Sequence, residues 1–288
     1  MINRFRVSMM SAFFVFIIIL PGSCWGLENV HTMDIGLIQP EKVHAETGTW
    51  TILDARPVSI WEKNHIPGAI SFSWESYTRT DDKKIAYRVF QPEEIAGILG
   101  KRGIDEQTKI AVYGDTDTSW GGEAWVVWLL SWLGHTGPVR LIEGGIDAWE
   151  KAGFPLTSES VTGTLLPKTY HVALRYQLNI SAEALERMKK DVFIVDTRSF
   201  MEWITGDRVP GAVHINWEEF YTGPLKTPLD ANALSRLLEK NGISFDKPVV
   251  YYCTGGIRSS FAWLTHQLAG KGSPVNFEGG TEEWKRRK

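Results

Sequence analysis

The stretch Phe193-Ile-Val-Asp-Thr-Arg198 has a counterpart earlier in the chain, Thr51-Ile-Leu-Asp-Ala-Arg56. Each copy is a short apolar run that ends in an aspartate and an arginine, and such a run is typical of a buried strand in a parallel sheet. Similarity at a nearly constant spacing indicates a duplicated domain. The two stretches therefore predict two copies of one structural unit.

Three further pairs of stretches follow in the same order and support the duplication. They are His65-Ile-Pro-Gly-Ala-Ile70 with Arg208-Val-Pro-Gly-Ala-Val213, Leu99-Gly-Lys-Arg-Gly-Ile104 with Leu238-Glu-Lys-Asn-Gly-Ile243, and Gly144-Gly-Ile-Asp-Ala-Trp149 with Gly279-Gly-Thr-Glu-Glu-Trp284. We expect one domain at residues 34–155 and a second at residues 169–288. Residues 156–168, rich in Ser, Thr and Gly, are predicted to be the linker between them.

Within each repeat, short β-branched runs alternate with segments of helical periodicity. The strand-like runs are residues 50–53, 110–113, 192–195 and 249–252. This alternation predicts an α/β fold with two doubly wound domains, each a parallel sheet with helices on both faces. In the second repeat, Ser181 is expected to cap a helix with Ala184, Leu185 and Met188 on one face. Ligands of such folds bind beyond the carboxyl ends of the strands, so catalytic residues are expected there.

Composition excludes several classes of protein. The 288 residues are 43% hydrophobic and 23% charged, which rules out a disordered or low-complexity chain. The formal charge of −3 gives no basic footprint for nucleic acid. The seven histidines show no metal-ligand spacing, and two cysteines are too few for a thiolate zinc site. We therefore expect no metal, no cofactor and no nucleic-acid partner.

Residues 1–26 have the order of a secretory signal peptide. Arg4 and Arg6 precede the apolar run from Val7 to Leu20, and small, helix-breaking residues follow it. The run is short for a membrane span, which needs about 20 apolar residues. We expect an exported protein, located in the periplasm. Two alternatives would attach it to the membrane: an uncleaved leader, or a lipoprotein modified at Cys24.

The segment Val249-Val-Tyr-Tyr-Cys253-Thr-Gly-Gly-Ile-Arg258 places a cysteine at the carboxyl end of a strand, followed by glycines and the start of a helix. Glycines allow backbone N–H groups to turn toward an anion, and a helix N-terminus adds partial positive charge. Such surroundings favour a thiolate, so Cys253 is the predicted nucleophile rather than a buried core residue. The residues expected to bind substrate beside it are Thr254, Gly255, Gly256, Ile257 and Arg258.

The Asp-x-Arg strand ends, the Pro-Gly-Ala turns, the cysteine loop and the closing Gly-Gly-x-x-x-Trp together resemble the rhodanese (thiosulfate sulfurtransferase) family in its tandem two-domain form. The resemblance covers nearly all of residues 34–288. It implies a catalytically silent first domain and a ping-pong reaction through a persulfide on Cys253. Four residues separate Cys253 from Arg258, whereas related phosphatases have five, so the resemblance implies sulfur transfer rather than phosphoester hydrolysis.

The first repeat has no thiol at the position of Cys253. Gly114 or Asp115 stands there, depending on how the strands are aligned, and a carboxylate would repel thiosulfate. The expected role of this domain is structural, with its loops forming one wall of a cleft over Cys253. The candidates for that wall are Tyr77, Arg79 and Trp120.

Arg198 has two interpretations. It ends the Asp-x-Arg strand as does the family's substrate-binding arginine, and the resemblance therefore implies that it binds substrate. The same pattern recurs as Arg56 in the repeat without a thiol, however, which indicates a structural bracket between Asp196 and Arg198. We favour the substrate role and keep the bracket as its alternative.

The predicted function is transfer of sulfane sulfur from thiosulfate to cyanide or a thiol acceptor through a Cys253 persulfide. The predicted partners are a small-molecule donor and acceptor, with a protein acceptor as an additional candidate. The loop matches neither the pattern of relatives that use 3-mercaptopyruvate nor that of the best known thiosulfate enzymes, and the arginine at its end suits a doubly charged oxyanion. The alternatives are a 3-mercaptopyruvate sulfurtransferase and a persulfide carrier with little turnover.

Overall fold

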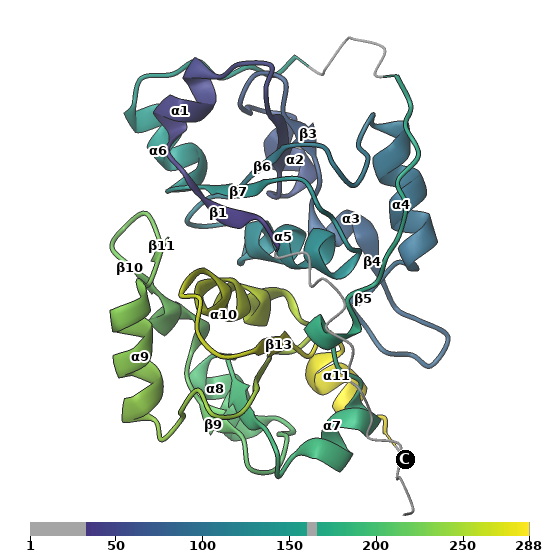
Figure 1. Ribbon diagram of the computed structural model, residues 1–288, viewed down its shortest axis with the longest axis vertical. Coiled ribbons are helices and arrows are strands. Elements are labelled where there is room, and N and C mark those ends of the chain that lie inside the picture. The colour runs from purple at the N-terminus through teal and green to yellow at the C-terminus, as the bar shows by residue number, and fades with distance from the viewer. Residues whose placement is uncertain (1–32, 160–165, 288) are drawn as a thin grey trace, which may run out of the picture. The chain divides into compact units, whose positions relative to one another are not determined.

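The structure is a computed structural model that describes residues 33–159 and 166–287 (Figure 1). The predicted signal peptide, with Cys24, and residues 160–165 of the predicted linker lie outside the described residues. Export and lipidation therefore stay predictions. Within the described ranges, none of the helices is both long and apolar enough to cross a membrane.

The first domain is built on a five-stranded sheet in the order β1-β7-β6-β2-β3, in which all neighbouring strands are parallel. Strands β4 and β5 form a separate antiparallel pair. The strands are β1 (Ile35–Ile38), β2 (Thr51–Asp54), β3 (Ile70–Ser71), β4 (Thr78–Arg79), β5 (Arg88–Val89), β6 (Ile110–Tyr113) and β7 (Val139–Ile142). The helices are α1 (Pro40–Ala45), α2 (Val58–Trp61), α3 (Trp74–Tyr77), α4 (Pro92–Lys101), α5 (Gly122–Trp132) and α6 (Gly145–Lys151).

The second domain repeats this plan with a four-stranded parallel sheet in the order β13-β12-β8-β9. Its strands are β8 (Phe193–Asp196), β9 (Val213–His214), β12 (Val249–Tyr252) and β13 (Pro274–Asn276), with β10 (Tyr221–Thr222) and β11 (Thr227–Pro228) as an antiparallel pair. Its helices are α7 (Ala182–Met188), α8 (Phe200–Thr205), α9 (Ala231–Lys240), α10 (Ile257–Leu268) and α11 (Gly280–Trp284), with two short 3₁₀ turns, η1 (Tyr176–Leu178) and η2 (Trp217–Phe220).

Helices cover both faces of each sheet, as the doubly wound fold requires. In β6, Val112 packs in one apolar cluster with residues of α4 and α5. Its neighbours Ala111 and Tyr113 point the other way and pack with residues of α1 and α6. In β12, Tyr251 faces the cluster that contains α9 and α10, while Tyr252 faces α7 and α11. The fold class expected from the sequence is confirmed.

Helices α5 and α10 pack against each other and join the cores of the two domains (Figure 1). Helix α5 is apolar around nearly its whole circumference, which suits a helix buried on all sides. Trp125 of α5 and Phe261 of α10 are buried in one continuous cluster. This shared core places the loops before α5 and α10 at the same interface.

One local expectation turns out differently. Ser181 caps α7 as predicted, accepting from the N–H of Ala184 at 3.2 Å, but Met188 is exposed, and Ala182 is buried with Leu185 instead. The helix ends at Met188, so that side chain projects beyond the part of α7 that packs on the sheet. The second sheet also lacks a full counterpart of β1, since a single bridge from Asn179 to β13 takes its place.

Candidate active site

Cys253 is the first residue after β12 and lies at the carboxyl edge of the second sheet. Its side chain is 2% exposed. The Thr281 N–H donates to the Cys253 carbonyl at 3.0 Å. Gly280 adopts φ +52, and a Cβ there would lie 2.5 Å from the same oxygen, so only glycine allows this close approach. The strand and α11 thus hold the cysteine in a fixed position.

The loop after Cys253 leaves backbone donors open. Among the described residues, no backbone acceptor bonds the N–H groups of Thr254, Gly255 and Gly256. Gly256 adopts φ +83 as the N-cap of α10, and Ile257 begins the helix. These N–H groups and the helix N-terminus together create a positive environment for an anion. The loop therefore provides an anion site next to the sulfur.

A buried network supports the loop from the α10 and β13 side. The Ser259 Oγ lies 3.7 Å from Cys253 Sγ and donates to Asn276 Oδ1 at 2.7 Å. Asn276 Nδ2 in turn donates to the Gly256 carbonyl at 3.1 Å. Ser259 and Asn276 are both fully buried. The network fixes the position of the helix start relative to the thiol.

Arg258 lies on the first turn of α10 and forms a two-pronged ion pair with Glu202. Its two terminal nitrogens each lie 2.7 Å from a carboxylate oxygen of Glu202. The Thr254 hydroxyl donates to the same carboxylate at 3.1 Å and accepts from Arg258 at 3.2 Å. The hydrogen bond from Arg258 lowers the pKa of Glu202 to about 2, so Glu202 carries a negative charge at neutral pH.

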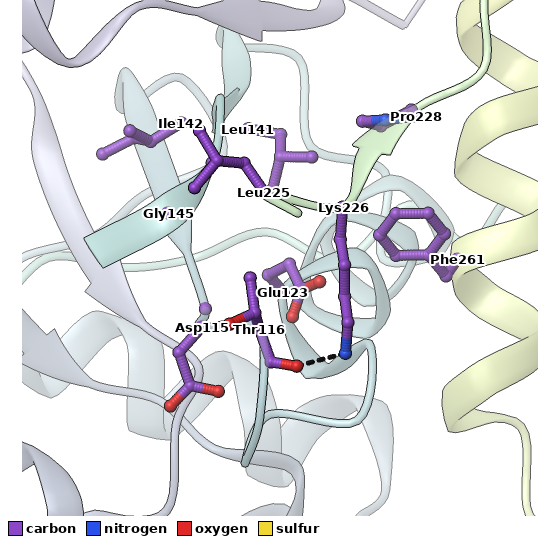
Figure 2. A pocket seen from close by; sticks show the side chains of 12 residues that line it. Asp115, Thr116, Glu123, Leu141, Ile142, Gly145, Leu225, Lys226, Pro228 and Phe261 are labelled. Atoms are coloured by element: carbon purple, nitrogen blue, oxygen red, sulfur yellow. Dashed lines mark hydrogen bonds between the residues drawn. The ribbon is translucent and has the colours of Figure 1, made fainter. Parts of the chain in front are cut away.

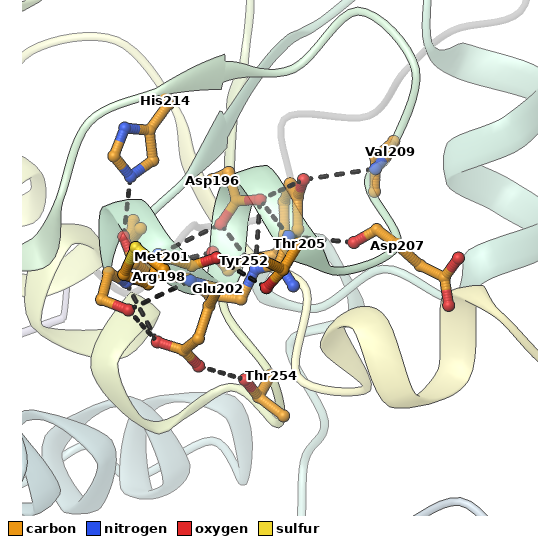
Figure 3. A network of polar contacts seen from close by, with 12 residues as sticks. Asp196, Arg198, Met201, Glu202, Thr205, Asp207, Val209, His214, Tyr252 and Thr254 are labelled. Carbon is orange, nitrogen blue, oxygen red and sulfur yellow. Dashed lines mark hydrogen bonds and ion pairs between the residues drawn. The ribbon is translucent and has the colours of Figure 1, made fainter.

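A capping box holds Glu202 in place at the start of α8 (Figure 3). The Ser199 N–H and hydroxyl donate to Glu202 Oε2 at 3.1 and 2.7 Å, and the Glu202 N–H donates back to the Ser199 Oγ at 3.3 Å. Such reciprocal bonds satisfy the free donors at a helix N-terminus. These bonds orient the Glu202 carboxylate toward Thr254, as Figure 3 shows.

Cys253 opens into a pocket of about 570 Å³ between the two domains. The first domain contributes aromatic side chains and the second contributes the reactive and charged groups. The lining residues are Trp74, Tyr87, Trp120, Ser199, Glu202, Cys253, Thr254, Ile257 and Arg258. The first domain therefore forms one wall of the cleft over the cysteine.

The wall residue Tyr87 is anchored through its neighbour Arg88. Arg88 bonds Glu278 at 2.8 Å and Glu283 at 2.5 Å, both in the second domain. Tyr87 adopts φ +63 and lies so near Gly255 that a Cβ on this glycine would be 2.4 Å from the Tyr87 Cβ. The ion pairs of Arg88 with Glu278 and Glu283 thus hold Tyr87 next to the loop that carries the thiol.

The structure resolves which residue of the first domain corresponds to Cys253. The Gly114 carbonyl accepts from the Ile146 N–H at 3.1 Å, as the Cys253 carbonyl accepts from Thr281. Gly145 approaches Gly114 as Gly280 approaches Cys253. Gly114 is therefore the counterpart, and it has no side chain with which to act as a nucleophile.

Asp115 fills the anion position of the first domain with its own carboxylate. Its Oδ1 accepts backbone N–H groups from Asp117 at 3.0 Å, Thr118 at 2.5 Å and Ser119 at 3.0 Å. Its Oδ2 accepts the Thr118 hydroxyl at 2.6 Å. Donors that remain open in the second domain are satisfied internally here, which supports a structural role for this loop.

Lys226, from the turn between β10 and β11, closes the space beside this loop (Figure 2). Its ammonium donates to the Thr116 carbonyl and lies 5.2 Å from the centre of the Trp217 ring. Glu123 lies in the same small pocket, and its Oε2 has no hydrogen-bond partner among the described residues. The space beside this loop of the first domain is therefore occupied by side chains of the protein itself.

A family model described as a rhodanese-like domain matches residues 40–152 and residues 181–287. The chain belongs to the rhodanese family. Its two matched segments correspond to the two sheets with their helices, and Cys253 lies in the second. Among the described residues of this rhodanese, no group of three or more His, Cys, Asp or Glu side chains is arranged to hold a metal ion.

The rhodanese is similar to several known proteins. It is 30% identical over 244 residues to a "Putative thiosulfate sulfurtransferase" of Haloferax volcanii, covering 78% of this chain and 81% of the relative. It is 28% identical to the sulfur carrier protein TtuD of Thermus thermophilus, covering 79% and 84%. The structure of the 3-mercaptopyruvate sulfotransferase SseA from Escherichia coli superposes with a TM-score of 0.74 at 18% identity, covering 85% and 98%, and shows the fold alone.

Arg198 is placed away from the pocket of the rhodanese. Its side chain is 5% exposed, and it bonds Asp196 at 2.7 Å and the Asp207 carbonyl at 2.9 Å (Figure 3). Arg56 forms the same buried pair with Asp54 in the domain without a thiol. These contacts agree with the structural bracket, and none supports the substrate role that we favoured for Arg198.

The residues of the first domain that line the pocket differ from those expected. Trp120 lines it, but Tyr77 is buried against Phe72, and Arg79 pairs with Glu94 at 2.6 Å. Trp74 and Tyr87 line the wall instead, and no local sequence pattern marks Tyr87. Glu202 and Ser199 were also missed, although their Ser-x-x-Glu spacing is a recognisable capping box.

Glu123 predicts a pH dependence of stability. Burial raises the pKa of Glu123 to about 7, from 4.5, so the folded protein keeps this proton at pH values where the unfolded chain has lost it. The contribution of Glu123 to the free energy of unfolding should therefore fall as the pH rises from about 4.5 to 7. In Glu123→Gln this loss is absent, and the variant should gain about 3 kcal/mol over wild type above pH 7.

Urea unfolding of both proteins at pH 4, 5.5, 7 and 8 measures this difference. It should be near zero at pH 4 and grow until about pH 7. Parallel stability curves across this range would show that Glu123 does not titrate as its surroundings imply.

Proposed function

We propose that this rhodanese is a thiosulfate sulfurtransferase that carries sulfane sulfur as a persulfide on Cys253. The single observation that supports it most strongly is the position of the Cys253 sulfur, in a pocket beside open backbone donors and the Arg258 guanidinium. The Haloferax volcanii relative is named as a sulfurtransferase, and the charge and geometry of the loop agree with that chemistry.

In the first half-reaction, the Cys253 thiolate attacks the outer sulfur of thiosulfate. A sulfur–sulfur bond forms to Cys253, the original sulfur–sulfur bond breaks, and sulfite leaves with the bonding electron pair. Arg258 and the Thr254 hydroxyl would hold the sulfonate oxygens, since both reach the pocket. The N–H groups of the loop would stabilise the negative charge of the persulfide.

In the second half-reaction, cyanide or a thiolate attacks the outer sulfur of the persulfide. The new bond forms to the acceptor, and Cys253 recovers its electron pair as a thiolate. No oxidant or reductant is consumed, because sulfane sulfur only moves between nucleophiles. The open side of the pocket, with Trp74 and Trp120, would receive the acceptor.

Thiosulfate is the proposed donor because the guanidinium of Arg258 matches a doubly charged oxyanion. The test compares kcat/KM for thiosulfate and for 3-mercaptopyruvate with cyanide as the acceptor. The proposal requires the thiosulfate value to be the larger. A larger value for 3-mercaptopyruvate would assign the chain to that donor, and the persulfide chemistry would remain.

The name of the Thermus thermophilus relative raises a second candidate, a sulfur carrier. A carrier would take up sulfur once and retain it until a protein acceptor arrives. Single-turnover loading with thiosulfate, followed by addition of cyanide, distinguishes the two. An enzyme releases thiocyanate within its turnover time, whereas a carrier keeps the persulfide until a protein acceptor is supplied.

A further inference from the structure

The Glu202 carboxylate binds the side chains that are expected to bind the sulfur donor. Both terminal nitrogens of Arg258 and the hydroxyl of Thr254 bond to it. These are the side chains expected to hold the sulfonate of the donor. Glu202 itself lines the pocket that contains Cys253, so a negative charge already stands where a donor anion would bind.

The ion pair of Arg258 differs from the buried ion pair of the same domain. The Arg198 and Asp196 side chains are 5% and 0% exposed, whereas those of Arg258 and Glu202 are 15% and 36% exposed. Water can therefore reach the Glu202 carboxylate, and separating it from Arg258 does not strand a fully buried charge. The pair beside the thiol is the one suited to exchange partners.

Helix α8, which carries Glu202, lies at the surface of the protein. It has six residues and none of them is buried. Phe200, Met201 and Ile204 are among the exposed large apolar side chains of the protein. Solvent therefore reaches the Glu202 side chain, and a donor anion in the pocket can approach the Arg258 and Thr254 groups that the carboxylate binds.

We propose that Glu202 is a specificity-determining residue that competes with the donor anion for Arg258 and Thr254. It weakens the binding of doubly charged donors more than that of singly charged ones, since the repulsion grows with the donor's charge. The sulfur chemistry at Cys253 is unaffected, so Glu202 acts on KM rather than on kcat. This inference rests on the proposed sulfurtransferase function.

The variant Glu202→Gln tests the proposal without removing the helix cap, because glutamine also completes a capping box. We expect the KM for thiosulfate to fall about tenfold and that for 3-mercaptopyruvate about threefold, with kcat changed less than about twofold. The matched control is Glu186→Gln, which removes the same charge from a residue of α7 that pairs with Lys189 just after the helix. Its KM values should equal those of wild type.

A second measurement needs no turnover. Cys253 is alkylated with iodoacetate, an anion, and with iodoacetamide, its neutral analogue, and the modified peptide is quantified by mass spectrometry. The alkylation rate with iodoacetate, divided by the rate with iodoacetamide, should rise about threefold in Glu202→Gln and stay constant in Glu186→Gln. The ratio reports the charge near the thiol and does not depend on which donor the enzyme uses.

The two measurements separate the two ideas. If wild type does not turn over thiosulfate but the alkylation ratio rises in Glu202→Gln, the proposed function is wrong, while the repulsion of anions by Glu202 at the thiol stands. If thiosulfate turnover is present but neither the ratio nor the KM moves as expected, Glu202 is not the specificity residue. A higher KM with an unchanged ratio would assign Glu202 a purely structural part and overturn the proposal.

Discussion

Replacing Cys253 with serine should lower kcat/KM for thiosulfate by about 10⁴-fold or more. The hydroxyl of serine is a far weaker nucleophile than a thiolate, and it cannot form a persulfide. Cys253 is the free cysteine of the described residues, and the backbone N–H groups of the three residues that follow it have no backbone acceptor among those residues. Steady-state production of thiocyanate from thiosulfate and cyanide measures the loss.

The matched control is Cys24→Ser, which makes the same exchange at the other cysteine of the chain. It should retain wild-type turnover. The near-equal size of serine and cysteine keeps the fold of Cys253→Ser intact, and an unchanged thermal midpoint would confirm it. Turnover within tenfold of wild type in Cys253→Ser would contradict the persulfide route.

The second large effect is expected at Arg258. The change Arg258→Gln should lower kcat/KM for thiosulfate about 100-fold, because it removes a charge-assisted fork that holds the sulfonate. It also leaves the Glu202 carboxylate without its partner inside the pocket. The kcat/KM of Arg258→Lys should lie between those of wild type and Arg258→Gln, since an ammonium retains the charge but not the planar fork.

The double variant Glu202→Gln with Arg258→Gln gives the sharper result. Removing the unpaired carboxylate should recover about three- to tenfold of the activity that Arg258→Gln loses. Equal kcat/KM values for the single and double variants would show that the carboxylate does not repel the donor. Activity of Arg258→Gln close to wild type would remove Arg258 from substrate binding altogether.

The fold could be predicted because the chain contains it twice. The runs at residues 110–113 and 249–252 form β6 and β12 with the expected bounds. The duplicated Asp-x-Arg ends mark equivalent strands, and the packing of α5 against α10 then joins the two copies. The repeat also pointed to the one loop with a thiol.

The alignment of the two loops could not be settled from the sequence. The first loop runs from Gly114 to Trp120 before the N-cap of α5, whereas the second runs only from Cys253 to Gly255 before that of α10. A loop that differs in length leaves the register open. The carbonyl contacts with the following helix identify Gly114 as the counterpart of Cys253.

Glu202 and Tyr87 were missed for a related reason. The capping box predicts where α8 begins, but the partner of its carboxylate lies far along the chain, in α10. Tyr87 lies next to Arg88, which bonds Glu278 and Glu283 of the other domain. Contacts of this kind depend on how the two domains pack, which local patterns do not contain.

Mass spectrometry of the protein after treatment with thiosulfate shows whether sulfur is carried on Cys253. We expect a gain of one sulfur atom, located on the peptide that contains Cys253 and lost again on addition of cyanide. An unmodified Cys253 in a protein that still produces thiocyanate would rule out transfer through a Cys253 persulfide.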